Sequence, residues 1–146
     1  MQPNIKNDLL YLLRILEACK KIGLYTHNFN TSNEFYASNN QLEVNATLNQ
    51  LAQIGEQAKK LSTTLLDKYI KISWNEIKGF RNIIVHEYSG IDIENVFKII
   101  QKDIPQLYSD IISIITKELT IGNFDNEEFE VAKSSPYLKH IDFSDF

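Results

Sequence analysis

Two side chains in one short segment, Arg81 and His86, could together handle a phosphate group and a proton. Only two of the chain's 15 Lys and Arg residues are arginines, Arg14 and Arg81, so a general preference for arginine does not explain position 81. Arginine always carries its charge and grips a phosphate through two parallel N–H donors. Histidine, with an ordinary pKa of about 6.5, exchanges a proton near neutral pH.

The spacing of these two residues sets a geometric condition. Five residues along an ideal α-helix correspond to about 140° of rotation, so Arg81 and His86 would not share one face. They converge only if the helix ends or distorts around His86, and Gly90 is a natural helix terminator. The alternative is an ion pair between Arg81 and an acid such as Glu76 or Glu56, with His86 as an ordinary helix-end histidine.

The elements that must position this segment are helices. Apolar residues recur every three to four positions over residues 5–25, 41–66 and 93–117, and a further helix is expected over 73–90. Residues 26–40 are polar and predict a loop with one short helical turn. Because no alternating strand pattern occurs, we expect an all-α fold: an antiparallel up-and-down bundle of four to five helices.

Individual residues predict local features of these helices. Gly55 inside the second helix costs about 1 kcal/mol relative to alanine, which indicates a close helix contact. Ser73 and Glu76 have the spacing of a capping box, in which Ser73 accepts from the backbone of Glu76. Asp92 is expected to cap the fourth helix, and Pro105 to kink it because proline lacks an N–H donor.

The run from Trp74 to Tyr88 resembles the HepT branch of the HEPN superfamily. The resemblance covers residues 5–117 and includes the upstream stretch Ile-Gly-Glu-Gln-Ala-Lys-Lys-Leu at 54–61. An Arg-x4-His pair alone would be weakly specific. Here Asn82 follows the arginine directly, Tyr88 follows the histidine by two positions, and Asp-Ile-Pro stands at 103–105.

The resemblance implies a homodimer in which two Arg-x4-His-x-Tyr motifs face each other across a cleft. In that family the cleft cuts RNA without a metal or other cofactor, by attack of the ribose 2′-hydroxyl on the adjacent phosphate. Arg81 and His86 would be catalytic, Asn82 would position Arg81 or a phosphate oxygen, and Tyr88 would line the cleft. Lys78, one turn before Arg81, is expected to help hold RNA.

The family also implies a partner and a modification. The chain would be the toxin of a type II HEPN/MNT toxin–antitoxin system, and an MNT-type nucleotidyltransferase antitoxin would silence it by adding AMP to Tyr88. Glu87 departs from the small residue that many relatives carry there. Pointing into the cleft it would raise the pKa of His86 and repel RNA, whereas pointing outward it changes nothing. The alternative function is a non-catalytic HEPN adaptor or substrate platform for a nucleotidyltransferase.

The length and the charge of the chain indicate its domain organisation and the kind of partner it can bind. A chain of 146 residues suits one core, with a helical bundle at 1–117 and an acidic extension containing aromatic residues at 118–146. The extension has seven acids and two bases, a charge of −5, so the total of −4 leaves +1 for residues 1–117. This distribution excludes a strongly basic DNA-coating protein and is compatible with a small RNA site. The extension could dock on the bundle, on the dimer mate or on a partner.

The remaining sequence features concern location and cysteine chemistry. No run approaches the roughly 18 apolar residues of a membrane span, and the polar start lacks a secretion signal, so a cytoplasmic protein without membrane contact is expected. Cys19, the single cysteine, has no ligand-spaced neighbours and is expected to pack in the core.

Overall fold

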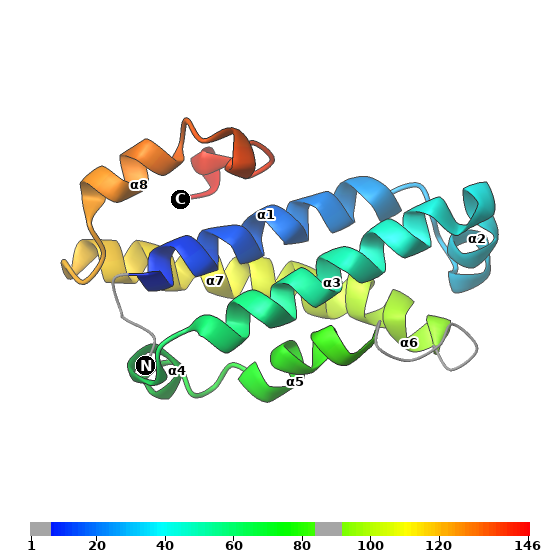
Figure 1. Cartoon of the computed structure of the whole chain (residues 1–146), viewed down its shortest axis with the longest axis horizontal. Coiled ribbons are helices and arrows are strands. Elements are labelled where there is room, and N and C mark those ends of the chain that lie inside the picture. Colours follow the sequence, from blue (N-terminus) through cyan, green and yellow to red (C-terminus); the bar gives the residue numbers. More distant parts are fainter. Residues whose placement is uncertain (1–6, 84–91) are drawn as a thin grey trace.

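In the computed structural model of the chain (Figure 1), residues 7–83 and 92–146 are described, and every regular element in them is helical. The all-α prediction is confirmed. The bundle consists of α1 (Asp8–Thr26), α3 (Leu42–Lys60), α5 (Trp74–Gly79) and α7 (Ile104–Thr120). In Figure 1, α1 and α5 run in one direction while α3 and α7 run in the other, which is the antiparallel up-and-down arrangement.

The core lies between α1, α3 and α7. The periodic apolar residues of these three helices point into it, as their spacing predicted. The largest fully buried side chains are Leu12, Leu13, Ile15, Leu16, Ile22, Leu51, Ile54, Ile111, Ile114 and Ile115, joined by Phe35 and Leu65. Cys19 is buried among them, which confirms its predicted packing role, and burial raises the pKa of its thiol to about 12.

The predicted helix over residues 41–66 is broken in two. α3 ends at Lys60, and α4 (Thr63–Lys68) begins after Ser62, whose hydroxyl accepts from the N–H of Leu65 at 3.2 Å. Ser62 also donates to Asp8, through its N–H at 2.9 Å and its hydroxyl at 2.5 Å. The apolar spacing continues across the break because Leu65 is buried as well, so periodicity alone did not reveal it.

The loop before α3 contains the predicted helical turn. α2 (Ser32–Ala37) is capped by Thr31, whose hydroxyl accepts from the N–H of Glu34 at 3.1 Å. A short 3₁₀ segment, η2 (Ser38–Gln41), then leads into α3.

The predicted fourth helix comprises three consecutive segments. Asp92 caps α6 (Ile93–Lys98) by accepting from the N–H of Asn95 at 3.1 Å, as predicted. A π-helical segment, η5 (Ile99–Asp103), connects α6 to α7. Pro105 lies in the first turn of α7, where a missing N–H donor costs least. The kink expected at Pro105 stays a prediction.

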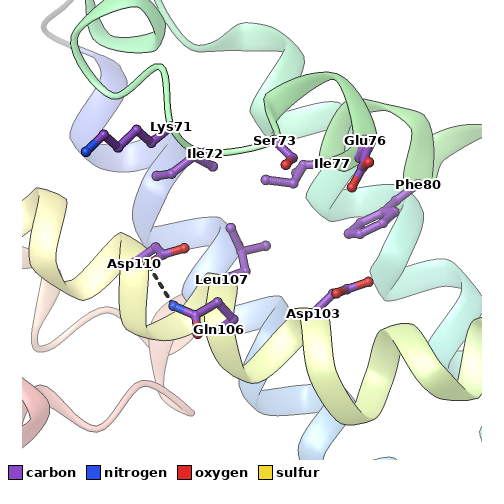
Figure 2. A pocket seen from close by; sticks show the side chains of 10 residues that line it. All are labelled: Lys71, Ile72, Ser73, Glu76, Ile77, Phe80, Asp103, Gln106, Leu107 and Asp110. Carbon is purple, nitrogen blue, oxygen red and sulfur yellow. Dashed lines mark hydrogen bonds between the residues drawn. The ribbon is translucent and has the colours of Figure 1, made fainter.

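A pocket of about 220 Å³ lies between α5 and α7 (Figure 2). Its floor is apolar and includes Ile77, Phe80 and Leu107, whereas Glu76, Asp103 and Asp110 supply carboxylates around it.

Beyond α7 the chain folds back along α1 (Figure 1). This part contains α8 (Asn126–Ala132), η6 (Pro136–Leu138) and η7 (Phe143–Asp145). Its side chains Phe124, Phe129, Leu138 and Ile141 are buried in the common core. Glu17 of α1 accepts from the backbone N–H of His140 at 2.6 Å and lies 2.7 Å from its Nδ1. The sequence left open whether residues 118–146 dock on the bundle, on the dimer mate or on a partner. In the structure they pack on the bundle of the same chain.

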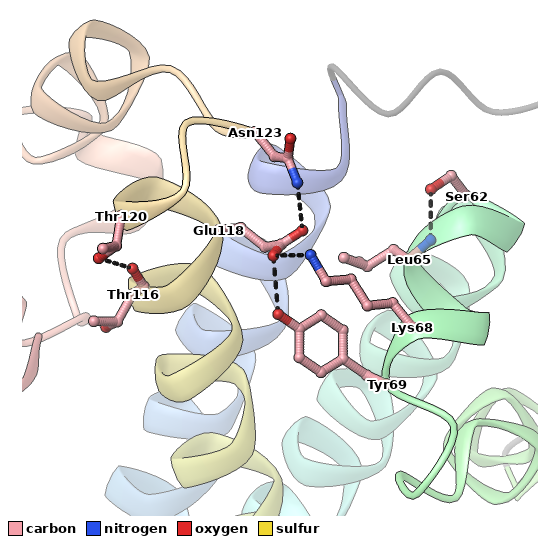
Figure 3. Close-up of polar contacts among 8 residues, drawn as sticks. All are labelled: Ser62, Leu65, Lys68, Tyr69, Thr116, Glu118, Thr120 and Asn123. Carbon is pink, nitrogen blue, oxygen red and sulfur yellow. Dashed lines mark hydrogen bonds and ion pairs between the residues drawn. The ribbon is translucent and has the colours of Figure 1, made fainter.

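The C-terminal end of α7 is tied to α4 by a buried carboxylate (Figure 3). Glu118, 1% exposed, lies 2.7 Å from Nζ of Lys68, 3.0 Å from the hydroxyl of Tyr69 and 3.3 Å from Nδ2 of Asn123. Burial alone would raise the pKa of Glu118, but these three hydrogen bonds outweigh it and lower that pKa. The charged form of Glu118 therefore stabilises the fold.

Within residues 7–83 and 92–146, none of the helices combines the length and the apolar composition that crossing a bilayer requires.

Candidate functional site

The first half of the Arg-x4-His-x-Tyr motif lies at the end of α5. Lys78 belongs to α5, and Arg81 and Asn82 belong to the 3₁₀ segment η3 (Phe80–Ile83) that follows it directly. The motif residues His86, Glu87 and Tyr88 lie outside the described residues, as does the predicted helix end at Gly90. Arg81 and Asn82 are exposed, and Lys78 is half-buried.

The change from α-helix to 3₁₀-helix occurs at Phe80, earlier than the sequence suggested. A 3₁₀-helix has three residues per turn instead of 3.6, so the side chains after Phe80 are rotated relative to a continuous α-helix. The distortion that was expected around His86 lies outside the described residues and stays a prediction. The relative placement of the two side chains stays a prediction.

Gly55 confirms the predicted close helix contact and shows what it contacts. A Cβ atom added to Gly55 would lie 2.7 Å from the backbone N of Arg81 and 2.9 Å from the carbonyl O of Lys78. It would also lie 3.1 Å from Cβ of Arg81. Glycine therefore allows α3 to lie directly against the backbone that carries the motif arginine.

The next residue on α3, Glu56, forms an ion pair with Arg81 through Oε1 and Nε. The arginine–acid pair considered from the sequence is thus present, with Glu56 and not Glu76 as the acid. Of the two side chains, 47% of Arg81 and 37% of Glu56 remain exposed. Exposed pairs are typically worth about 0–1 kcal/mol, so this pair adds little stability and leaves the charge of Arg81 partly in solvent.

Trp74 lies at the start of α5. Its side chain is 7% exposed, and its Nε1 donates to the carbonyl O of Tyr69 at 3.0 Å. The predicted capping box at Ser73 is wrong, because Ser73 precedes the helix but its side chain makes no capping hydrogen bond. At this end of the helix the backbone N–H of Trp74 donates to Ile72 O at 2.8 Å and that of Ile77 to Ser73 O at 3.1 Å, and the indole of Trp74 is buried.

The pocket beside Phe80 is unsuited to a phosphate (Figure 2). Three carboxylates line it against one lysine, Lys71, so its local charge repels an anion. The positive charge of Arg81, whose side chain is 47% exposed, is better suited to an anion. In the described stretches, no three His, Cys, Asp or Glu side chains converge in a way that could hold a metal ion.

Comparison with known proteins identifies the family of this fold and motif. A family model described as Ribonuclease HepT-like matches residues 15–114. The chain belongs to this family. The match includes α3, with Gly55 and Glu56, and the complete motif from Arg81 to Tyr88.

Several relatives of the chain come from Methanocaldococcus jannaschii. One, named Putative RNase, is 31% identical over 69% of this chain and 90% of its own length. Another, named Gamma-glutamylcyclotransferase and putative RNase, is 32% identical over 75% of this chain. This chain spans about half of that second relative, 48% of its length. Probable ribonuclease HepT of Thermococcus cleftensis is 31% identical over 42% of this chain and 56% of its own length. No solved structure matches the chain.

The site residue that sequence reasoning undervalued is Glu56. It entered only as one of two acids that could pair with Arg81. Its position directly after Gly55, in the upstream stretch that resembles the HepT branch, was the available signal.

Proposed function

We propose that this HepT-like chain is a metal-independent endoribonuclease that cuts RNA at a cleft between two copies, with Arg81 and His86 as its catalytic residues. The observation that carries the proposal is the placement of Arg81. Its backbone lies against α3 at Gly55, its Nε is paired with Glu56, and 47% of its side chain remains exposed to solvent. Membership of the ribonuclease HepT-like family supports the same reading.

The proposed reaction is an internal transfer at phosphorus. The ribose 2′-oxygen attacks the adjacent phosphate, the bond from phosphorus to the 5′-oxygen breaks, and the fragments end in a 2′,3′-cyclic phosphate and a 5′-hydroxyl. One His86 accepts the proton of the 2′-hydroxyl, and His86 of the second copy donates a proton to the leaving oxygen. Arg81 stabilises the charge that builds on the phosphate, and such contributions are each commonly worth about 10²–10³-fold in rate.

The neighbouring polar residues have supporting roles in this proposal. Asn82 orients Arg81 or a phosphate oxygen, Lys78 adds positive charge to the RNA-binding surface, and Tyr88 lines the cleft. An MNT-type nucleotidyltransferase antitoxin adds AMP to Tyr88. The added phosphate places negative charge beside Arg81 and occupies the position of the RNA phosphate, which switches the toxin off.

Expression of the chain by itself tests the activity. The wild type is expected to slow growth and degrade RNA, and the purified protein to cut RNA in EDTA, whereas Arg81→Ala and His86→Ala lose these effects. Arg14→Ala is the matched control, because Arg14 is the other arginine and is exposed on α1. Intact RNA and equal growth in all four strains would rule out a nuclease.

The acidic surroundings of the motif favour one alternative, a non-catalytic adaptor for a nucleotidyltransferase. Glu87 adjoins His86, and three carboxylates line the pocket that contains Phe80. An adaptor would bind its nucleotidyltransferase and leave RNA intact with or without it. Mass spectrometry of the chain produced with and without that enzyme tests the modification: mass added in steps of one AMP, absent from Tyr88→Phe, is expected.

A further inference from the structure

Two consecutive residues of α3 contact the motif arginine, and they do so in different ways. Gly55 contacts its backbone, since the missing Cβ would lie 2.7 Å from Arg81 N. Glu56 contacts its side chain, through the pair between Oε1 and Nε of Arg81. Gly55 therefore contacts the backbone of Arg81, and Glu56 contacts its guanidinium group.

Because Glu56 contacts Nε of Arg81, the other N–H donors of the guanidinium group remain available to a ligand. A guanidinium group has five N–H donors, one on Nε and two each on Nη1 and Nη2, in a fixed plane. A carboxylate at Nε leaves the outer edge, formed by Nη1 and Nη2, as a second two-pronged donor surface. That outer edge has the geometry that binds two oxygens of one phosphate.

We infer that Glu56 is a positioning residue: it holds Arg81 through Nε and thereby presents the Nη1–Nη2 edge to the RNA phosphate. This inference rests on the proposed ribonuclease function. In the proposed reaction Glu56 contacts no substrate atom and accepts no proton. Its whole effect on RNA binding is exerted through Arg81.

α3 is suited to hold the arginine, whereas η3 by itself is not. α3 has 19 residues, and Leu51, Ile54 and Ala58 around the contact are each 0% exposed. η3 is a 3₁₀ segment of four residues, a length at which helices have little stability of their own. Restricting Arg81 before RNA arrives removes part of the side-chain ordering cost that binding would otherwise include.

A neutralising role for Glu56 and a positioning role predict opposite effects of its removal on RNA binding. A carboxylate that only neutralises Arg81 or repels RNA would weaken binding, and its removal would strengthen it. A positioning carboxylate strengthens RNA binding, and its removal would weaken it. Because exposed ion pairs are worth little, the expected loss on removing Glu56 is modest, up to about 5-fold.

The test is a double-mutant cycle with an RNA that binds without being cut, a short oligonucleotide with 2′-O-methyl groups. Glu56→Ala is expected to weaken binding about 5-fold in the wild type and to have no further effect in Arg81→Ala. Glu56→Gln retains an oxygen that accepts from Nε and is expected to restore most of the loss. Glu128→Ala on α8, an exposed acid far along the chain, controls for the general removal of negative charge.

A second readout observes Arg81 directly. Since the chain contains two arginines, a ¹⁵N spectrum of the arginine Nε–H groups contains two signals, and Arg14→Ala identifies the other. The Arg81 Nε–H signal is expected to exchange slowly with water in the wild type and to exchange as slowly when RNA binds. In Glu56→Ala it is expected to exchange fast.

The outcomes separate this inference from the proposed function. Three outcomes would each overturn the positioning role while the nuclease stands: tighter RNA binding by Glu56→Ala, an equal loss of binding in the presence and absence of Arg81, or fast exchange of the Arg81 Nε–H in the wild type. A wild-type chain that neither binds nor cuts RNA would overturn both.

Discussion

The contact at Gly55 allows a sharp test of how the motif arginine is held. In Gly55→Ala the new Cβ would lie 2.7 Å from Arg81 N and 2.9 Å from Lys78 O, at least 0.5 Å short of the 3.4 Å at which ordinary contacts begin. Both atoms belong to the backbone and cannot rotate away as a flexible side chain would. The α5–η3 backbone must therefore move away from α3.

The expected stability change is the difference between two effects. Overpacking in a filled interior costs about 1–3 kcal/mol, and contacts with two backbone atoms place this site in the upper part of that range. Alanine in place of glycine in a helix returns about 0.5–1 kcal/mol. The net loss is about 1–2 kcal/mol, which for a domain of this size lowers Tm by roughly 3–8 °C.

Gly23→Ala is the matched control. Gly23 also lies in a long helix, α1, but no atom lies within 4 Å of where its Cβ would be, so only the helix propensity changes. Thermal and urea unfolding followed by circular dichroism should show Gly23→Ala stabilised by about 0.5–1 kcal/mol and Gly55→Ala destabilised. RNA cleavage should fall in Gly55→Ala only. A Gly55→Ala protein as stable and as active as Gly23→Ala would refute the close-contact reasoning.

Three further predictions concern the rest of the fold. Glu118→Gln should lower the free energy of unfolding by about 1–3 kcal/mol, measured in urea, because the charge-assisted bond from Lys68 is weakened. Since the folded pKa of Glu118 lies below its ordinary value of 4.5, its contribution is complete above that pH and is lost as the pH falls through the folded pKa, so Glu118→Gln should show a flatter acid profile. Cys19, with a pKa of about 12, should react with a thiol reagent only after unfolding, and rapid labelling of the native protein would contradict its burial. Phe129→Ala should cost about 3–5 kcal/mol in a single unfolding transition, because the ring packs against the rings of Phe143 and Phe146; a separate early transition would show that residues 121–146 unfold independently.

The local features of the helices could be predicted from the sequence where their causes are local. The caps at Thr31 and Asp92 each involve a side chain and a backbone N–H three residues apart, so a short window of sequence contains both partners. The apolar stripes of α1 and α3 likewise depend only on the helical repeat. These features predicted the all-α class and the approximate extent of α1.

Features that depend on distant partners could not be predicted in this way. The break between α3 and α4 combines a local cap, Ser62 accepting from the N–H of Leu65, with hydrogen bonds from Ser62 to Asp8, 54 positions away. The apolar repeat continues through the break, and the contact with Asp8 had no local signal. The missing cap at Ser73 likewise had no local signal, since the capping pattern is present in the sequence. The docking of His140 on Glu17 spans 123 positions and had no local signal.

In the candidate site, too, some features follow from the local sequence and others depend on distant partners. The sequence by itself determined the residue types that can bind a phosphate and move a proton, Arg81 and His86, and the family motif that includes them. It also showed that Gly55 needs a close neighbour. Only the tertiary structure decided that this neighbour is the backbone of Arg81 and that Glu56 pairs with its Nε. The reason is physical: chemistry resides in side chains that the sequence names, whereas orientation comes from contacts between helices, which exist only after the chain has packed.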